Sequence, residues 1–165
     1  MNDIMTGESK WAVCRPTQRE RARMAMRSET VTAAIIMREG KVLIGQRHRN
    51  SSYPGSWEFP GGKMEAGETP EECMARELLE EMDIRVVVGE RLAQVSHTYP
   101  DITIELIALK CEFSEDEISD IGCETHAWVA PNELSEYDLL PPDREIAAVL
   151  FKEVEEEGRL SQDLF

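Results

Sequence analysis

The chain of 165 residues has a formal net charge of −15, because 33 Asp and Glu outnumber 18 Lys and Arg. Its hydrophobic content of 41% and charged content of 31% are typical of one soluble globular domain with its own core. Such an acidic surface repels DNA and RNA backbones, so we expect a small nucleotide rather than a nucleic acid polymer as partner. No apolar run approaches the length of a membrane span and no signal peptide is evident, so we expect a cytoplasmic protein with no membrane partner.

Residues 1–28 form a basic extension that contrasts with the acidic body. Its basic residues are Lys10, Arg15, Arg19, Arg21, Arg23 and Arg27. Two interpretations stay open: a poorly ordered extension, or a segment that docks on the acidic domain or on the second subunit of a homodimer. We expect the domain itself at residues 29–158 and a C-terminal tail at residues 159–165.

Period-two alternation and β-branched residues predict most of a sheet. The expected strands cover residues 30–37, 41–46, 85–95, 102–113 and 125–130. The first two strands are joined by the turn Arg38-Glu39-Gly40, which predicts a hairpin.

Two further segments have a helical pattern. We expect a helical turn at residues 132–137 and, after a proline pair, a helix from Asp143 to about residue 157. The expected buried side of that helix is Ile146, Ala147, Val149, Leu150 and Val154.

The segment from Gly61 to Ile84 joins a glycine-rich bend to a helix. Thr69 suits the N-cap, Pro70 suits the first helical position, and Glu72 completes a capping box, which predicts a helix from residue 70 to about residue 82. The expected apolar stripe is Ala75, Leu78, Leu79 and Met82.

Three carboxylates, those of Glu77, Glu80 and Glu81, lie on the opposite side of this predicted helix. Carboxylates within one turn repel one another, so they form either a solvated acidic face or the ligands of a hard cation such as Mg²⁺. The glycines before the helix favour the second interpretation, because they let backbone groups approach a ligand closely.

The spacing of this segment resembles the Nudix hydrolase signature G-x5-E-x7-R-E-U-x-E-E-x-G-U, in which U is a bulky apolar residue. The matching residues are Gly62, Glu68, Arg76, Glu77, Leu78, Glu80, Glu81 and Ile84. Asp83 departs from the pattern, because the family has a glycine there that ends the helix. Aspartate tolerates a positive φ better than most residues, so we expect a small stability cost and no loss of chemistry.

The resemblance implies the Nudix fold, of α/β (α+β) class, with a mixed β-sheet sandwiched between helices. It also implies hydrolysis of a nucleoside diphosphate linked to another group, with Mg²⁺ as cofactor and Mn²⁺ as a substitute. The run WEFPGGK before the helix resembles the MutT-like branch of the family. By that resemblance the metal ligands are Glu77, Glu80, Glu81 and the Gly61 carbonyl, and the candidate catalytic carboxylates are Glu77, Glu81 and Glu124.

The same resemblance places Arg47 on the nucleotide phosphates and Phe59 near the base. Core packing is the alternative interpretation for Phe59 and for its neighbour Trp57. Supporting roles fall to Gly62 and to an ion pair between Glu68 and Arg76 that orients the acids. For the loop acid, Glu117 and Asp120 compete with Glu124.

Asp143 aligns with the residue that contacts the base in MutT-type proteins, which is an asparagine in MutT itself. A carboxylate only accepts hydrogen bonds unless it is protonated, so Asp143 favours a base edge that donates, such as an exocyclic amine. A helix start also favours an acidic residue through the macrodipole alone, so a purely structural role is the alternative.

The resemblance to MutT-like enzymes implies hydrolysis of a triphosphate to monophosphate and pyrophosphate. Oxidised guanine triphosphate (8-oxo-dGTP), removed to protect DNA, competes with CTP or dCTP as the substrate; ADP-ribose or a dinucleotide is less favoured. A non-catalytic nucleotide sensor is the alternative from another class. Sensors commonly lack one acid or the arginine, whereas Arg76, Glu77, Glu80 and Glu81 are all present here, which favours an enzyme.

Overall fold

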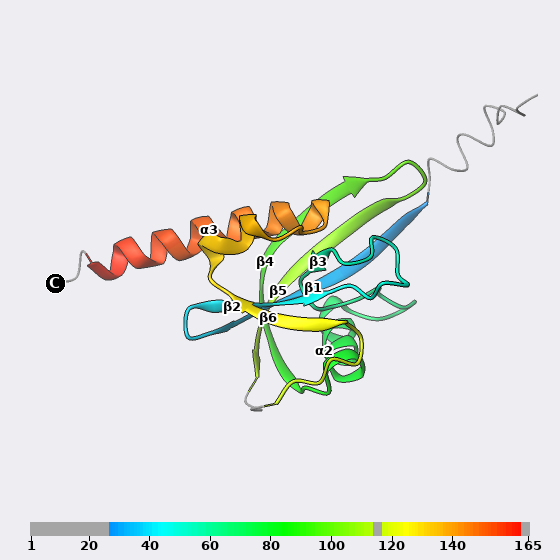
Figure 1. Ribbon diagram of the computed structural model, residues 1–165, viewed down its shortest axis with the longest axis horizontal. Coiled ribbons are helices and arrows are strands. Elements are labelled where there is room, and N and C mark those ends of the chain that lie inside the picture. Colours follow the sequence, from blue (N-terminus) through cyan, green and yellow to red (C-terminus); the bar gives the residue numbers. More distant parts are fainter. Residues whose placement is uncertain (1–26, 114–116, 163–165) are drawn as a thin grey trace, which may run out of the picture.

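A mixed sheet forms the middle layer of the molecule, with a helix against each of its faces (Figure 1). The elements are β1 (Ser28–Arg38), β2 (Lys41–Gln46), β3 (Trp57–Glu58), α2 (Pro70–Met82), β4 (Val86–Thr98), β5 (Thr103–Phe113), β6 (Thr125–Val129), the 3₁₀ helix η1 (Pro131–Glu136) and α3 (Pro141–Gln162). This computed structural model describes residues 27–113 and 117–162. Most of the predicted basic extension therefore lies outside the described residues.

The sheet has six strands in the order β3-β2-β1-β5-β4, with β6 paired to β2. β1 and β5 run parallel from the pair Ser28 and Thr103 to the pair Ile36 and Cys111. β4 is antiparallel to β5, and β1 and β2 form the predicted antiparallel hairpin. The predicted mixed sheet between helices is thereby confirmed.

β1 is buried on both faces, which explains its continuous apolar run. Ala33 and Ile35 pack into the cluster that includes Ile146, Ala147 and Leu150 of α3. Ala34 and Ile36 alternate with them and pack into the cluster that includes Met74, Leu78 and Met82 of α2. Successive side chains of a strand point to opposite faces, so one strand anchors both helices.

The predicted capping of α2 is confirmed. Thr69 Oγ1 accepts from the Glu72 N–H at 3.2 Å, and Glu72 Oε2 accepts from the Thr69 N–H at 2.9 Å. At the other end Asp83 adopts the left-handed conformation, with φ 55° and ψ 34°, and its N–H donates to the Leu78 and Leu79 carbonyls. Asp83 therefore ends the helix in the conformation that a glycine adopts most easily.

The predicted apolar stripe of α2 is wrong in two places. Leu79 is 42% exposed and Ala75 is also exposed, because the contact with the sheet runs along Met74, Leu78 and Met82, four residues apart. The helix also buries Cys73, which the expected stripe left out.

Helix α3 differs from its prediction at both ends and on one side. It begins at Pro141 and continues to Gln162, so residues 159–162 of the predicted tail are helical. Val149 is 37% exposed, contrary to its assignment to the buried side, since the sheet is covered by Ile146 and Leu150. No helix within 27–113 and 117–162 is long and apolar enough to cross a membrane.

Candidate active site

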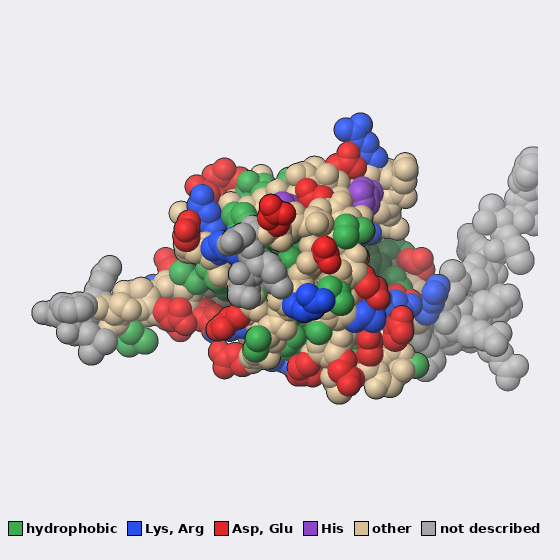
Figure 2. Space-filling model, turned by 90° about the horizontal axis from the view of Figure 1, so that it is seen from below, with side chains coloured by type: hydrophobic (Ala, Val, Ile, Leu, Met, Phe, Trp, Pro, Cys, Tyr) green, Lys and Arg blue, Asp and Glu red, His purple; other side chains and the backbone are tan. Residues whose placement is uncertain are grey.

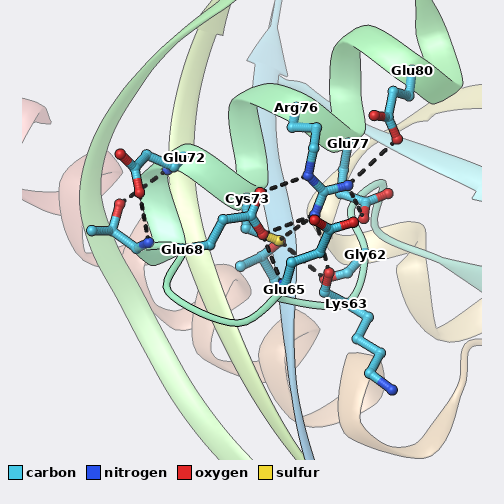
Figure 3. A network of polar contacts seen from close by, with 11 residues as sticks. Gly62, Lys63, Glu65, Glu68, Glu72, Cys73, Arg76, Glu77 and Glu80 are labelled. Atoms are coloured by element: carbon cyan, nitrogen blue, oxygen red, sulfur yellow. Dashed lines mark hydrogen bonds and ion pairs between the residues drawn. The ribbon is translucent and has the colours of Figure 1, made fainter.

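Arg76 of α2 joins the helix to the bend that precedes it (Figure 3). Its Nε and Nη2 donate to the two carboxylate oxygens of Glu68, at 2.6 Å and 2.9 Å, which is the predicted ion pair. This hydrogen bonding lowers the pKa of Glu68 to about 2. Nη2 also donates to the Lys63 carbonyl at 3.2 Å, so the guanidinium holds the loop at two points.

The same guanidinium reaches the other acids of the helix. Nη1 of Arg76 donates to Glu77 Oε1 at 2.8 Å and to Glu80 Oε2 at 3.4 Å. The side chain of Glu77 is 13% exposed and that of Glu80 is 60% exposed. Arg76 therefore orients the nearly buried Glu77 tightly and the solvated Glu80 loosely.

The two glycines of the bend lie where no side chain fits. A Cβ on Gly61 would lie 2.1 Å from the Thr32 carbonyl oxygen, and one on Gly62 would lie 2.2 Å from Glu77 Cδ. Gly61 also has φ 152°, outside the range usual for other residues. The bend is therefore packed between β1 and the Glu77 carboxylate.

β1 binds the carbonyls on either side of Gly61. The Ala34 N–H donates to the Pro60 carbonyl at 2.7 Å, and the Thr32 N–H donates to the Gly62 carbonyl at 2.8 Å. Neither of these hydrogen bonds uses the Gly61 carbonyl.

Glu81 lies in the most negative part of the site. Burial, followed by the negative charges of Glu77 and Glu58, raises its pKa to about 7. A Cβ on Gly122 would lie 2.6 Å from Cβ and Cγ of Glu81, so this loop glycine fits against the carboxylate's stem. A half-buried group of carboxylates is stabilised by a cation.

The donors fit a hard cation in kind, although they do not already enclose one. Within residues 27–113 and 117–162, no three His, Cys, Asp or Glu side chains stand in a ready metal-binding arrangement, and Arg76 occupies oxygens of Glu77 and Glu80. The carboxylates of Glu77 and Glu81 and the carbonyl of Gly61 are oxygen donors, which Mg²⁺ prefers. The closeness of Gly62 to Glu77 leaves that carboxylate facing the bend.

A cleft of about 500 Å³ opens beside the bend. The residues that line it include Glu29, Thr32, Arg47, Tyr53, Glu58, Phe59, Gly61, Tyr99, Asp101 and Asp143. Arg47 Nη1 donates to both oxygens of Glu58, at 2.8 Å and 2.7 Å, and its Nε donates to the Ser52 carbonyl at 2.7 Å. The structure therefore brings the predicted residues Arg47, Phe59, Gly61 and Asp143 to one cleft.

Asp143, in the first turn of α3, is the buried carboxyl of this cleft. It is 4% exposed, and its Oδ1 accepts from the Phe59 backbone N–H at 2.8 Å. Burial raises its pKa to about 7, although this hydrogen bond opposes the shift. Both the acid and the carboxylate are therefore populated near neutral pH, so Asp143 has a donor form as well as an acceptor form.

The two aromatic residues before the bend are mostly core residues. Phe59 is 3% exposed and belongs to the cluster under α3, and one part of it lines the cleft. Trp57 packs against the same cluster, with its ring edge-on to Tyr137 at 5.1 Å between centroids. Core packing therefore accounts for Trp57. Phe59 packs in the core and also lines the cleft, so it fits both interpretations of the sequence.

Glu124 lies with a basic loop rather than against α2. Its Oε2 is 3.3 Å from His48 Nδ1, and its Oε1 is 3.7 Å from Arg49 Nε. The competitor Asp120 pairs with His126 at 2.5 Å, and Glu117 is exposed. The structure thus does not join these loop acids to Glu77 by a direct contact among the described residues.

Comparison with known proteins decides the family. The model of the NUDIX domain matches residues 31–149, which is more than half of the chain. The chain belongs to the Nudix family. Both the resemblance seen in the sequence and the expected Nudix fold are confirmed.

Relatives of this Nudix chain have named activities. It is 37% identical over 121 residues to a CTP pyrophosphohydrolase of Escherichia coli (strain K12), which covers 72% of this chain and 87% of the relative. It is 44% identical over 77 residues to an 8-oxo-dGTP diphosphatase of Proteus vulgaris, which covers 46% of this chain and 69% of the relative.

Solved structures agree with this assignment. The E. coli ORF135 protein superposes with a TM-score of 0.70 at 33% identity, covering 78% of this chain and 91% of that one. The MutT protein of Methanosarcina mazei Go1 also gives a TM-score of 0.70, at 25% identity, covering 80% of this chain and 96% of that one.

Two residues of the candidate site were missed in the sequence. Glu58 pairs with Arg47 and raises the pKa of Glu81, and its own pKa is raised by burial against the effect of Arg47. Its position between Trp57 and Phe59 was the available signal, because alternation turns it away from the apolar neighbours. Gly122 had no such signal, since its contact with Glu81 joins distant parts of the chain.

Gly62→Ala is expected to lower kcat about 100-fold, because the new methyl group displaces the Glu77 carboxylate. Gly122→Ala should also lower kcat, because its methyl group displaces the Glu81 side chain. The control is Gly158→Ala, at an α3 position with nothing within 4 Å of the added Cβ. Steady-state kinetics and thermal melting of all three variants test this. Wild-type turnover in a folded Gly62→Ala protein would contradict it.

Asp143 is expected to make stability fall as pH rises. Its pKa is about 7 in the folded protein against an ordinary value of 3.8, so only the folded state keeps the proton between about pH 4 and 7. The contribution is complete below pH 4 and lost above pH 7. Asp143→Asn removes this loss while its side-chain oxygen still accepts from Phe59.

Urea unfolding at a series of pH values measures the effect. The free energy of unfolding of Asp143→Asn minus that of the wild type should rise between pH 4 and 7, by on the order of a few kcal/mol. Glu156→Gln, on the exposed part of α3, is the control. A difference that does not vary with pH for Asp143→Asn would show that the carboxyl ionises normally.

Proposed function

We propose that this Nudix hydrolase cleaves a nucleoside triphosphate to the monophosphate and pyrophosphate. The observation that carries the proposal is the half-buried carboxylate group of Glu77, Glu81 and Glu58 beside a cleft of about 500 Å³ that also holds Arg47 and Asp143. A cation stabilises such a group of negative charges. A divalent cation can bind these carboxylates and the oxygens of a polyphosphate at the same time.

Glu77, Glu80, Glu81 and the Gly61 carbonyl would hold Mg²⁺, with Mn²⁺ as a substitute. When bound, the cation neutralises charge on the phosphate oxygens and lowers the pKa of water. Nudix hydrolases typically use divalent metals, and the oxygen-only donors of this site suit one.

The protein's own groups position the reactants and accept a proton. The oxygen of a water molecule forms a bond to phosphorus as the bridging P–O bond breaks, and the electron pair of that bond leaves with pyrophosphate. The proton of the water passes to Glu77 or Glu81, with Glu124 on the neighbouring loop as the third candidate. Arg76 keeps Glu77 oriented through the hydrogen bond of 2.8 Å.

Arg47 and Asp143 would bind the two ends of the nucleotide. Arg47 lies in the cleft wall with its guanidinium fixed by Glu58 and by the Ser52 carbonyl, so it is available in one orientation for the departing phosphates. Asp143 is buried in the same cleft, and Phe59 beside it supplies an apolar surface. In this proposal the base-binding end lies next to the start of α3.

Two bases remain in competition. Guanine and 8-oxoguanine present an N–H and an amine, which an ionised Asp143 accepts; cytosine presents an amine beside a ring nitrogen, which suits the protonated acid. The relatives include both a CTP pyrophosphohydrolase and an 8-oxo-dGTP diphosphatase. Oxidised or modified triphosphates would make the activity one of nucleotide-pool sanitation, which protects DNA.

A non-catalytic nucleotide sensor is the alternative from another class. It would not need Arg76 to hold three carboxylates, whereas Arg76 contacts Glu68, Glu77 and Glu80 here. The complete network favours an enzyme.

Glu77→Gln is expected to lower pyrophosphate release from nucleoside triphosphates with Mg²⁺ by at least about 100-fold. The amide oxygen still accepts from Arg76, so the fold should persist, but the negative charge is lost. Glu156→Gln is the control. Pyrophosphate and phosphate are measured separately over a panel of nucleotides, with circular dichroism as the check on folding. Unchanged turnover would remove Glu77 from the mechanism.

Asp143→Asn is expected to change the order of kcat/KM values among bases more than the overall rate. An amide carries a donor and an acceptor at every pH, whereas the carboxyl changes between the two roles near its pKa of about 7. The panel should contain CTP, dCTP, dGTP and 8-oxo-dGTP. An identical order in wild type and variant would place the base elsewhere.

A further inference from the structure

Two tyrosines from distant parts of the chain meet at the cleft. Tyr53 lies on the loop between β2 and β3, and Tyr99 lies in the turn between β4 and β5. Their ring centroids are 5.7 Å apart with an interplanar angle of 45°, and both residues line the same cleft as Asp143. The Nudix signature does not predict this pair of rings, because the signature lies in other elements.

Tyr53 is held in place without being buried. It is 50% exposed, so core packing does not explain its position. Its φ of 57° is in the left-handed region, where a bulky residue is rarely found. The Ser56 N–H donates to the Tyr53 carbonyl at 3.3 Å, and the Arg47 side chain binds the adjacent Ser52 carbonyl. The loop therefore keeps a large, half-exposed ring in an unusual conformation, which occurs often at ligand sites.

Tyr99 packs against the ring of His97. Its ring stands edge-on to the ring of His97 at 4.7 Å between centroids, and His97 Nδ1 is 4.0 Å from Glu145 Oε1 of α3. Partial burial raises the pKa of Tyr99, and the nearby Tyr53 and the charge of Asp143 add to that rise. The phenol is thus close to both Tyr53 and Asp143.

The cleft combines a polar group for a base edge with aromatic surface. Asp143 lines the cleft at one place, and the rings of Tyr53 and Tyr99 line it at another. A nucleobase has hydrogen-bonding edges and two flat faces, and stacking on aromatic side chains is a strong, sequence-tolerant way to bind the faces. Figure 2 shows acidic side chains spread over one face of the molecule, with hydrophobic and basic side chains among them.

We infer that Tyr53 and Tyr99 form an aromatic wall on which the nucleobase stacks, and that Tyr53 is a residue that determines base affinity. The inference rests on the proposed function in one respect, that the ligand is a nucleotide. Arg47 links the loop that carries Tyr53 to Glu58, because it donates to the Ser52 carbonyl next to Tyr53 and to the Glu58 carboxylate.

The test compares ligands with and without a base on the full chain. Titration calorimetry measures the Kd of CMP and dGMP against that of ribose 5-phosphate, none of which is a triphosphate. Tyr53→Ala should weaken binding of the nucleoside monophosphates about tenfold and leave ribose 5-phosphate unchanged. Tyr53→Phe should keep most of the affinity, because the ring is retained. For triphosphates, KM should rise in Tyr53→Ala with kcat nearly unchanged.

Leu160→Ala, at a 68% exposed apolar position on α3, is the control and should bind every ligand as the wild type does. Tyr99→Leu is the second variant and should weaken only the ligands with a base. Equal losses for nucleotides and ribose 5-phosphate, or no loss in either tyrosine variant, would overturn the inference. A wild type that hydrolyses no triphosphate overturns the proposed function instead, while the ratio of Kd values still decides the role of the tyrosines.

Discussion

The site depends on the contact of one guanidinium with a loop and a helix. Arg76 binds both oxygens of Glu68, one oxygen of Glu77 and the carbonyl of Lys63, so the glycine bend and α2 cannot move independently. The network is partly buried, with the Arg76 side chain 24% exposed and that of Glu68 16% exposed. Partial burial and bidentate geometry make such a pair more rigid than an ordinary surface ion pair. This rigid network fixes the orientation of the Glu77 carboxylate.

The sheet brings the other half of the site to this network. Hydrogen bonds from β1 to the Pro60 and Gly62 carbonyls fix the bend along the strand, and β3 continues directly into it. Glu58 at the end of β3 then lies within electrostatic range of both Glu81 and Asp143. One strand-like segment therefore connects the carboxylates of α2 with the buried carboxyl of α3, although the two helices cover opposite faces.

Like charges held together are the main electrostatic cost of this arrangement. Burial and neighbouring carboxylates raise the pKa of Glu81 to about 7, and burial raises that of Asp143 to about 7. Arg47 offsets part of the cost through its ion pair with Glu58. Structures commonly keep such unfavourable groups where a ligand binds, because selection maintains them for function rather than for stability. Tyr53, with its positive φ at the mouth of the cleft, fits the same pattern.

The sequence by itself determined the elements whose signals are local. The capping box and the spacing of Arg76, Glu77, Glu80 and Glu81 predicted helix α2 and the family, because a helix brings residues three and four apart to one side. Apolar alternation predicted the hairpin and the long strands. Tertiary structure alone decided which side of α2 is buried. The apolar pattern predicted that Leu79 is buried, whereas the helix packs on the sheet through Met74. It alone also placed Glu58 beside Arg47, Gly122 against Glu81 and Tyr53 beside Tyr99. Such contacts depend on how whole elements pack. The periodicity within one segment does not predict which residue of a distant segment it will contact.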